Sequence, residues 1–260
     1  MHAASLKQFA NQLADAARAA ALPHFGEPLV MHKKDDDSPV TRADREAEQA
    51  MRELLWELAP EHGVIGEEFG ARNEDAEFVW VLDPIDGTKA FITGKPLWGT
   101  LIGLMRNRQP VLGVIDLGAL DRRWVGMDAT TTENGVATRT STQSDLTLAR
   151  VGCTSPQMFN SEEHDVVMAL IDEAWFCSWG GDCAAYATLA SGHLDLVVEA
   201  DLAPYDYMAL IAVVGGAGGV ITDWHGQALT GDGYARVVAA ANPALHEQAL
   251  TFLSRVRLAR

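Results

Sequence analysis

The stretch Trp80-Val-Leu-Asp-Pro-Ile-Asp-Gly-Thr-Lys-Ala-Phe91 places two aspartates three residues apart at the end of an apolar run. A buried strand over 78–82 would present Asp83 at its carboxyl end. Pro84 removes a backbone donor, so it is expected to stop the strand and to bend the chain until Asp86 turns toward Asp83. The stretch therefore predicts a sheet edge that carries two neighbouring carboxylates.

Gly87 and Thr88 follow the second aspartate directly. Glycine lets the backbone approach a ligand closely, and threonine is expected to cap the short helix that follows. Carboxylates beside free backbone N–H groups suit the holding of a divalent cation against a phosphate. Two further acids stand at the ends of apolar elements, Glu67 after a short strand and Asp206 at the start of a helix. One acid in such a place usually caps a helix or faces solvent, but four together predict a metal site.

The 260 residues carry 36 acidic and 20 basic side chains, a formal net charge of −16. This charge disfavours binding to nucleic acid or to an anionic membrane, because both require a basic surface. An acidic protein that binds phosphate must neutralise its own site, and metal ions do so most simply. The three cysteines form no C-x-x-C pair, the N-terminus lacks a signal-peptide core, and no apolar run reaches membrane-spanning length. We therefore expect a globular cytoplasmic protein that binds neither nucleic acid nor a membrane.

The pattern of apolar residues changes near residue 140. Before it, two amphipathic helices, over 3–20 and from 41, accompany short strands joined by tight turns, which favours an antiparallel meander. After it, strands and helices alternate as in α/β proteins. The strands are expected at 64–66, 78–82, 98–105, 111–117, 122–127, 148–153, 175–178, 194–199, 219–222 and 236–241, and the later helices at 161–173, 182–191, 205–217 and from 243. We predict one compact unit with an α+β half over 1–140 and an α/β half over 141–260.

Three motifs in this order resemble the inositol monophosphatase superfamily, which comprises metal-dependent, lithium-sensitive phosphomonoesterases. They are Gly66-Glu-Glu68, Asp83-Pro-Ile-Asp-Gly-Thr-Lys-Ala-Phe91 and Asp206-Tyr-Met-Ala-Leu with Gly215-Gly-Ala-Gly-Gly219. The resemblance covers nearly the whole chain and implies a layered αβαβα sandwich. The superfamily often has tryptophan before the last aspartate, where this chain has Tyr205. That change is expected to concern local packing and to leave metal binding intact.

The resemblance also implies the residues of an active site. Two or three Mg²⁺ ions would be bound by four carboxylates and one backbone carbonyl, those of Glu67, Asp83, Asp86, Asp206 and Ile85. The phosphate would lie against two of these aspartates and a cradle, namely Asp86, Asp206, Gly87 and Thr88. Lys33 and Asp44 match an early lysine–aspartate pair that the superfamily uses in catalysis. A metal-activated water would attack the phosphorus in line, with Glu67 and Thr88 orienting and deprotonating it while Asp44 polarises Thr88.

Further strings resemble the histidinol-phosphate phosphatases of this superfamily, namely Gly180-Gly-Asp-Cys-Ala-Ala-Tyr186, Ser191-Gly-His-Leu-Asp-Leu-Val-Val-Glu199 and Ala200-Asp-Leu-Ala-Pro-Tyr-Asp-Tyr-Met208. They imply the hydrolysis of L-histidinol phosphate to L-histidinol and phosphate, a step of histidine biosynthesis. Asp182, Glu199 and Asp201 would accept hydrogen bonds from the ammonium and imidazole groups of that substrate. For Asp201, a plain turn residue is an almost equal interpretation.

Three alternatives stay open at this point. An inositol-1-monophosphatase would use the same metal site with a polyol pocket. A 3′-phosphonucleotide (bisphosphate nucleotide) phosphatase often shares the string D-G-T-K-x-F, which this chain has at 86–91. A non-catalytic regulatory binding protein would instead show a damaged metal set or a basic surface, and the sequence has neither. The resemblance further implies a homodimer, and each catalytic alternative has a small phosphomonoester as its partner.

Overall fold

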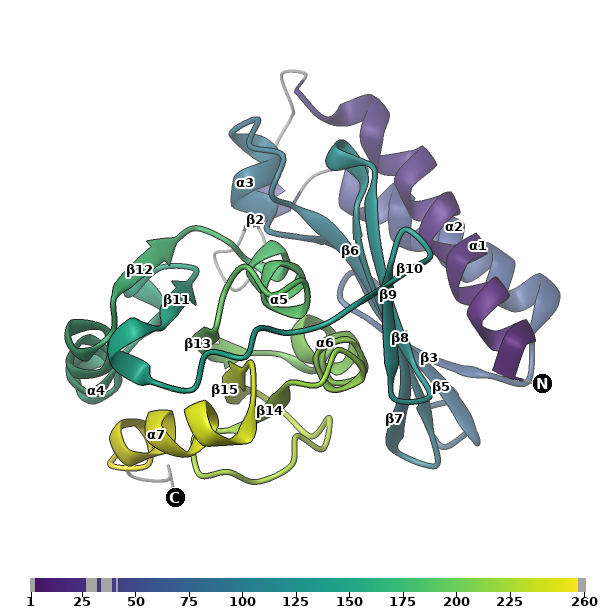
Figure 1. The fold of residues 1–260 in the computed structure, drawn as a ribbon. Helices are drawn as coiled ribbons and strands as arrows, with labels where there is room; N and C mark the ends of the chain where they lie inside the picture. The colour runs from purple at the N-terminus through teal and green to yellow at the C-terminus, as the bar shows by residue number, and fades with distance from the viewer. Residues whose placement is uncertain (1–2, 27–31, 34–38, 41, 257–260) are drawn as a thin grey trace.

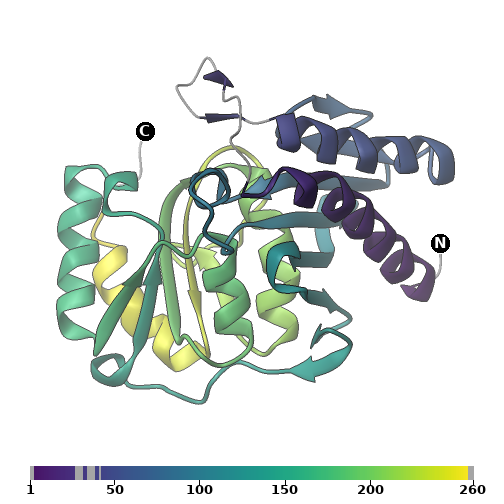
Figure 2. The same cartoon turned by 90° about the horizontal axis from the view of Figure 1, so that it is seen from above.

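The computed structural model describes residues 3–26, 32–33, 39–40 and 42–256. Two main β-sheets alternate with three groups of helices, so that the chain forms five layers (Figure 1). The view from above separates the layers, with the amino-terminal helices at one side and the helices over 161–173 and 243–253 at the other (Figure 2). The αβαβα sandwich that the family resemblance implies is confirmed. None of the helices in the described ranges combines the length and the apolar character that crossing a membrane requires.

The α-helices are α1 (Ala3–Ala21), α2 (Arg42–Leu58), α3 (Thr88–Ile92), α4 (Ser161–Glu173), α5 (Cys183–Ala190), α6 (Pro204–Gly216) and α7 (Pro243–Leu253). A two-stranded antiparallel pair consists of β1 (His32–Lys33) and β2 (Pro39–Val40). The first main sheet has the order β10-β9-β8-β7-β6-β5-β3-β4 and is made of β3 (Gly63–Gly66), β4 (Gly70–Arg72), β5 (Phe78–Asp86), β6 (Gly99–Arg106), β7 (Gln109–Leu117), β8 (Arg122–Met127), β9 (Thr130–Glu133) and β10 (Val136–Thr138). The second has the order β12-β11-β13-β15-β14 and is made of β11 (Arg150–Cys153), β12 (Phe176–Trp179), β13 (Leu196–Leu202), β14 (Val220–Asp223) and β15 (Ala235–Ala240).

Helices α1 and α2 cover the outer face of the first sheet (Figure 1). In α1, Leu6, Phe9 and Leu13 recur at helical spacing and are buried, so one apolar stripe faces the sheet. The ring of Phe9 meets that of Trp80 in β5 edge to face, with ring centroids 5.4 Å apart. This packing anchors the strand that leads to Asp83.

Helices α5 and α6 fill the layer between the two sheets. Two glycines of the first sheet let α6 lie directly on the sheet backbone. A Cβ on Gly113 would stand 1.9 Å from the carbonyl oxygen of Ala209, and one on Gly126 would stand 2.2 Å from that of Ala212. Any larger residue at either position would push α6 away, so this close approach sets where the first turn of α6 meets β5.

The second sheet is mixed, and α4 and α7 cover its outer face. Strand β11 runs parallel to β12 and β13, whereas β15 is antiparallel to β13 and β14. A register shift between Glu199 and Leu202 interrupts the pairing of β13 with β15. One of the two residues between them, Asp201, has a φ of 60°, the left-handed region that non-glycine residues seldom adopt. The carboxyl end of β13 is therefore irregular.

Three local expectations differ from the structure. Strand β5 does not stop at Pro84 but runs to Asp86, because the sheet accommodates the proline through a register shift between Asp83 and Asp86. Thr88 does not cap α3 but is its first residue, and Gly87 occupies the N-cap position at a φ of 81° without a side-chain cap. The first sheet is not a pure antiparallel meander either, because the chain turns back through β4 before it enters β5, which leaves β3 parallel to β5.

Candidate active site

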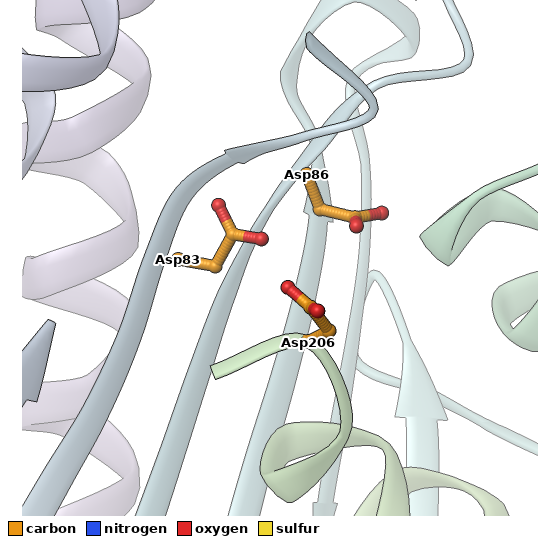
Figure 3. A group of neighbouring side chains, drawn as sticks. All are labelled: Asp83, Asp86 and Asp206. Carbon is orange, nitrogen blue, oxygen red and sulfur yellow. The ribbon is translucent and has the colours of Figure 1, made fainter. Parts of the chain in front are cut away.

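Three carboxylates from distant parts of the chain share one space at the end of β5 (Figure 3). Asp83 and Asp86 belong to β5, and Asp206 lies in the first turn of α6. One carboxylate oxygen from each lies within 4.8 Å of the others. The structure therefore brings together three of the four acids that the sequence singles out as metal ligands.

Hydrogen bonds to the backbone hold these side chains in place. Asp83 accepts the N–H of Ile85 through Oδ1 at 3.0 Å, which closes the bend around the proline. The carbonyl of Ile85 accepts the hydroxyl of Thr88 at 3.3 Å, so the predicted carbonyl ligand lies beside the predicted phosphate cradle. In α6, the carboxylate of Asp206 accepts the N–H of Ala203 at 2.7 Å. Each carboxylate thus keeps at least one oxygen with unused acceptor capacity for a further ligand.

The clustered carboxyl groups are difficult to ionise together. Burial raises the pKa of Asp83 well above its ordinary value, and neighbouring carboxylates, chiefly Glu67, raise it further. Burial together with the charge of Asp182 raises the pKa of Asp86 to about 7. Burial and the charge of Asp86 likewise raise the pKa of Asp206. A divalent cation would relieve this repulsion, and clustered carboxylate oxygens are the ligands that Mg²⁺ and Ca²⁺ prefer, so the donor set fits such an ion.

Of the other predicted catalytic residues, the structure relates only some to this group of carboxylates. Glu67 directly follows β3 and donates its N–H to the Leu82 carbonyl at 3.2 Å, and its carboxyl group is close enough to that of Asp83 to raise the pKa of Asp83. Asp44 is 1% exposed in the first turn of α2. Lys33 belongs to β1, and its side chain lies outside the described residues. The structure places Glu67 at the carboxylates, whereas the roles of Asp44 and Lys33 stay predictions.

Asp182 borders the carboxylates from the middle layer. It precedes α5 with a φ of 43°, and its carboxyl group would lie 3.3 Å from a Cβ on Gly87. The next residue, Cys183, donates its N–H to the carboxylate of Asp86 at 2.5 Å. Burial raises the pKa of Asp182, whereas the charge of Lys89 lowers it. The start of α5 is therefore tied to both the predicted cradle and the metal-binding strand.

Glu199 and Asp201 lie in different surroundings. Glu199 is buried in β13 and accepts the hydroxyl of Tyr186 at 2.9 Å, and burial raises the pKa of its carboxyl group to about 8. Asp201 is exposed within the register shift and lines a cavity of about 590 Å³ together with Tyr207 and Trp224. The described lining of that cavity includes none of the three clustered aspartates. Of Glu199 and Asp201, Glu199 is therefore the buried carboxyl group whose ionised form a cationic ligand would stabilise.

The sequence profile of the inositol monophosphatase family matches residues 2–257. The chain belongs to this family. It is 44% identical to the chloroplastic bifunctional phosphatase IMPL2 of Arabidopsis thaliana, over 94% of this chain and 73% of that protein. It is 34% identical to the histidinol-phosphatase of Streptomyces coelicolor, over 95% of this chain and 96% of that protein. A solved inositol monophosphatase from Zymomonas mobilis superposes with a TM-score of 0.89 at 41% identity, covering 98% of this chain and 100% of the other.

Family membership makes the chain a phosphatase that acts on small phosphomonoesters, and the enzymes of this family depend on metal ions. The cluster of Asp83, Asp86 and Asp206 gives that dependence a structural location that could hold a metal. The resemblance read from the sequence motifs is thereby confirmed at the level of the family.

A buried charged pair, Glu48 and Arg52, lies behind the site and is not part of any of the motifs described above. Glu48 and Arg52 lie on the stripe of α2 that also buries Met51 and Leu55. Their signal was available, because an acid and a base four residues apart on an apolar helix face must be paired if they are buried. The hydroxyl of Tyr186 was missed as well, since only folding brings it to Glu199.

Proposed function

We propose that this phosphatase hydrolyses L-histidinol phosphate to L-histidinol and phosphate in histidine biosynthesis. The observation that carries the proposal is the buried carboxyl group of Glu199, whose pKa is raised to about 8. A substrate with an ammonium or imidazolium group would restore the charged form and be held by it, whereas a neutral polyol would not. Similarity to histidinol-phosphatases over nearly their full length supports the same choice.

The proposed mechanism needs groups that bind metal and groups that activate water. Asp83, Asp86, Asp206, Glu67 and the carbonyl of Ile85 would hold Mg²⁺, which when bound neutralises the phosphate and lowers the pKa of a coordinated water. Glu67 would accept a proton from the attacking water, because its side chain already lies against Asp83. The hydroxyl of Thr88 would orient that water.

Three further residues complete the proposed mechanism. Asp44, buried in the first turn of α2, would polarise the hydroxyl that orients the water. Asp182 would meet the polar end of the substrate from the start of α5, beside the backbone of Gly87. Lys33 would keep the catalytic role that the family resemblance implies for the early lysine–aspartate pair.

Inositol-1-monophosphatase activity is the second candidate, because a solved structure described as an inositol monophosphatase shares 41% identity with this chain. Parallel assays should compare histidinol phosphate, inositol 1-phosphate and adenosine 3′,5′-bisphosphate at saturating Mg²⁺. We expect the highest kcat/KM for histidinol phosphate. If either of the other two substrates is preferred, the substrate assignment is wrong. Phosphate release from none of them would favour the non-catalytic alternative.

We also propose the homodimer that the sequence analysis expects. Strand β12 is an edge strand; Trp175 directly before it is 65% exposed, and Phe176 and Trp179 within it are 42% and 41% exposed. An exposed aromatic edge of this kind is suited to burial against a second copy. Sedimentation velocity should show a dimer that the exchange of Phe176 for a charged residue dissociates. The cytoplasmic location stays a prediction from the sequence.

A further inference from the structure

Glu48 and Arg52 form a buried ion pair on α2, with exposed fractions of 0% and 4%. The Nε of Arg52 donates to Oε1 of Glu48 at 2.7 Å. A buried charge is strongly unfavourable unless its remaining hydrogen-bonding capacity is satisfied. The partners that satisfy this pair therefore indicate what it is built to hold.

Those partners are the backbone groups of the turn between β3 and β4. Oε2 of Glu48 accepts the N–H of Glu68 at 2.7 Å, and Oε1 accepts that of Phe69 at 3.2 Å. The guanidinium of Arg52 donates to the carbonyl of Gly70 at the far side of the turn. The carboxylate of Glu48 thus accepts hydrogen bonds from two successive N–H groups of a three-residue loop, and Arg52 donates one to the strand that follows.

The strand before the turn is shaped to admit this carboxylate. A Cβ on Gly66 would stand 2.1 Å from Oε1 of Glu48, so any side chain at this position would displace the carboxylate. Glycine here is therefore required by the close approach of Glu48 and not by the backbone conformation, because Gly66 is not among the glycines with positive φ.

Glu67 is the first residue of that turn. Its own N–H donates to the Leu82 carbonyl at 3.2 Å, and its side chain reaches Asp83. Glu67 is consequently fixed from two sides, by β5 in front and by Glu48 through the next two peptide groups behind. If the hydrogen bonds of Glu48 were lost, only the contacts with β5 would still position Glu67.

We propose that Glu48 is a positioning residue that, through the turn at 67–69, fixes the Glu67 carboxylate against Asp83 and so sets the metal affinity and the turnover of the enzyme. The inference rests on the proposed role of Glu67 as a metal-binding and water-orienting group. Arg52 neutralises the charge of Glu48, so that the pair adds no net negative charge behind an already acidic site.

Glu48→Gln tests this proposal, because the side chain keeps its size while one acceptor oxygen becomes an NH₂ group that must face backbone donors. We expect Mg²⁺ binding, measured by titration calorimetry without substrate, to weaken about tenfold, and kcat to fall by about tenfold or more with little change in KM. Arg52→Lys keeps the charge but loses the fork of donors, so a smaller change in the same direction is expected. It also serves as the readout if Glu48→Gln does not fold.

Asp195→Asn is the matched control. Asp195 is 0% exposed, pairs with Arg150 at 2.8 Å, and accepts the backbone N–H of Arg150, but it directly precedes β13 and lies outside the group of Asp83, Asp86 and Asp206. Asp195→Asn should lower the melting temperature while Mg²⁺ affinity and kcat stay at the wild-type level. If Glu48→Gln behaves in the same way as this control, the positioning role is refuted.

Glu67→Gln separates this proposal from the proposed function on which it depends. When Glu67→Gln weakens Mg²⁺ binding and Glu48→Gln does not, the positioning role alone is wrong. When Glu67→Gln leaves Mg²⁺ binding and turnover intact, the assignment of Glu67 itself fails, and the inference about Glu48 fails with it.

Discussion

Replacement of Asp86 by asparagine should stabilise the metal-free protein while it abolishes the response of the protein to Mg²⁺. The pKa of Asp86 is raised from 3.8 to about 7, mainly by burial. An acid whose pKa is higher in the folded state destabilises that state when it is ionised. This penalty is absent below the ordinary pKa, grows as the pH rises from about 4 to about 7, and is complete above about pH 7.

The size of the effect follows from the shift. Each pH unit by which the pKa rises corresponds to about 1.4 kcal/mol, so the full pKa shift of Asp86 would destabilise the folded state by about 4 kcal/mol. Asp86 is only partly shielded from water, and solvent screening reduces this value to about 2 kcal/mol. Asparagine keeps an oxygen that can accept the N–H of Cys183, now at 2.5 Å, so no hydrogen bond needs to be lost. We expect Asp86→Asn to raise the metal-free melting temperature by roughly 5 °C near pH 8.

The assay is thermal unfolding of both proteins in a chelator and in Mg²⁺, near pH 8 and near pH 4. In the chelator, the advantage of Asp86→Asn should vanish as the pH falls toward 4. In Mg²⁺, the wild type should gain stability from the bound ion and the variant should not. Asp75→Asn is the control, because Asp75 is exposed before the opposite end of β5. A metal-free Asp86→Asn protein that is less stable than wild type near pH 8 would refute the reasoning.

Three other variants test separate parts of the site and the fold. Asp83→Asn should abolish turnover in a folded protein, and full activity in a phosphate-release assay would contradict its role as a metal ligand. Glu199→Gln should lower kcat/KM for histidinol phosphate at least about tenfold and change that for inositol 1-phosphate far less, so an equal loss for both would remove the argument for a cationic substrate. Asp195→Asn should cost about 3 kcal/mol in chemical denaturation, because it leaves Arg150 without its buried partner. Burial opposes ionisation of Asp195, but hydrogen bonds from Arg150 and Ser141 outweigh it and lower the pKa of Asp195 below 3.8. The stability that the ionised Asp195 contributes is therefore present above pH 3.8 and should be lost as the pH falls through the folded-state pKa.

Most of the helices and strands, and the acids they carry, follow from local patterns in the chain. The apolar run before Asp83 predicts β5, and the spacing of Leu6, Phe9 and Leu13 predicts α1, because both patterns depend only on neighbouring residues. The two aspartates around Pro84 predict a metal-binding edge for the same reason. Their prediction failed in one detail, since pairing with β6 carries the strand through the proline by a register shift.

The set of acids that come together depends on how the layers pack. Asp206 reaches Asp83 because Gly113 and Gly126 let α6 lie directly on the first sheet, and no local pattern contains that contact. The register shift in β13 likewise separates Asp201 from Glu199, although the two are close in sequence. Propensity and periodicity act over a few residues, whereas the distances between carboxylates, and the burial that shifts their pKa values, depend on how whole layers pack against one another.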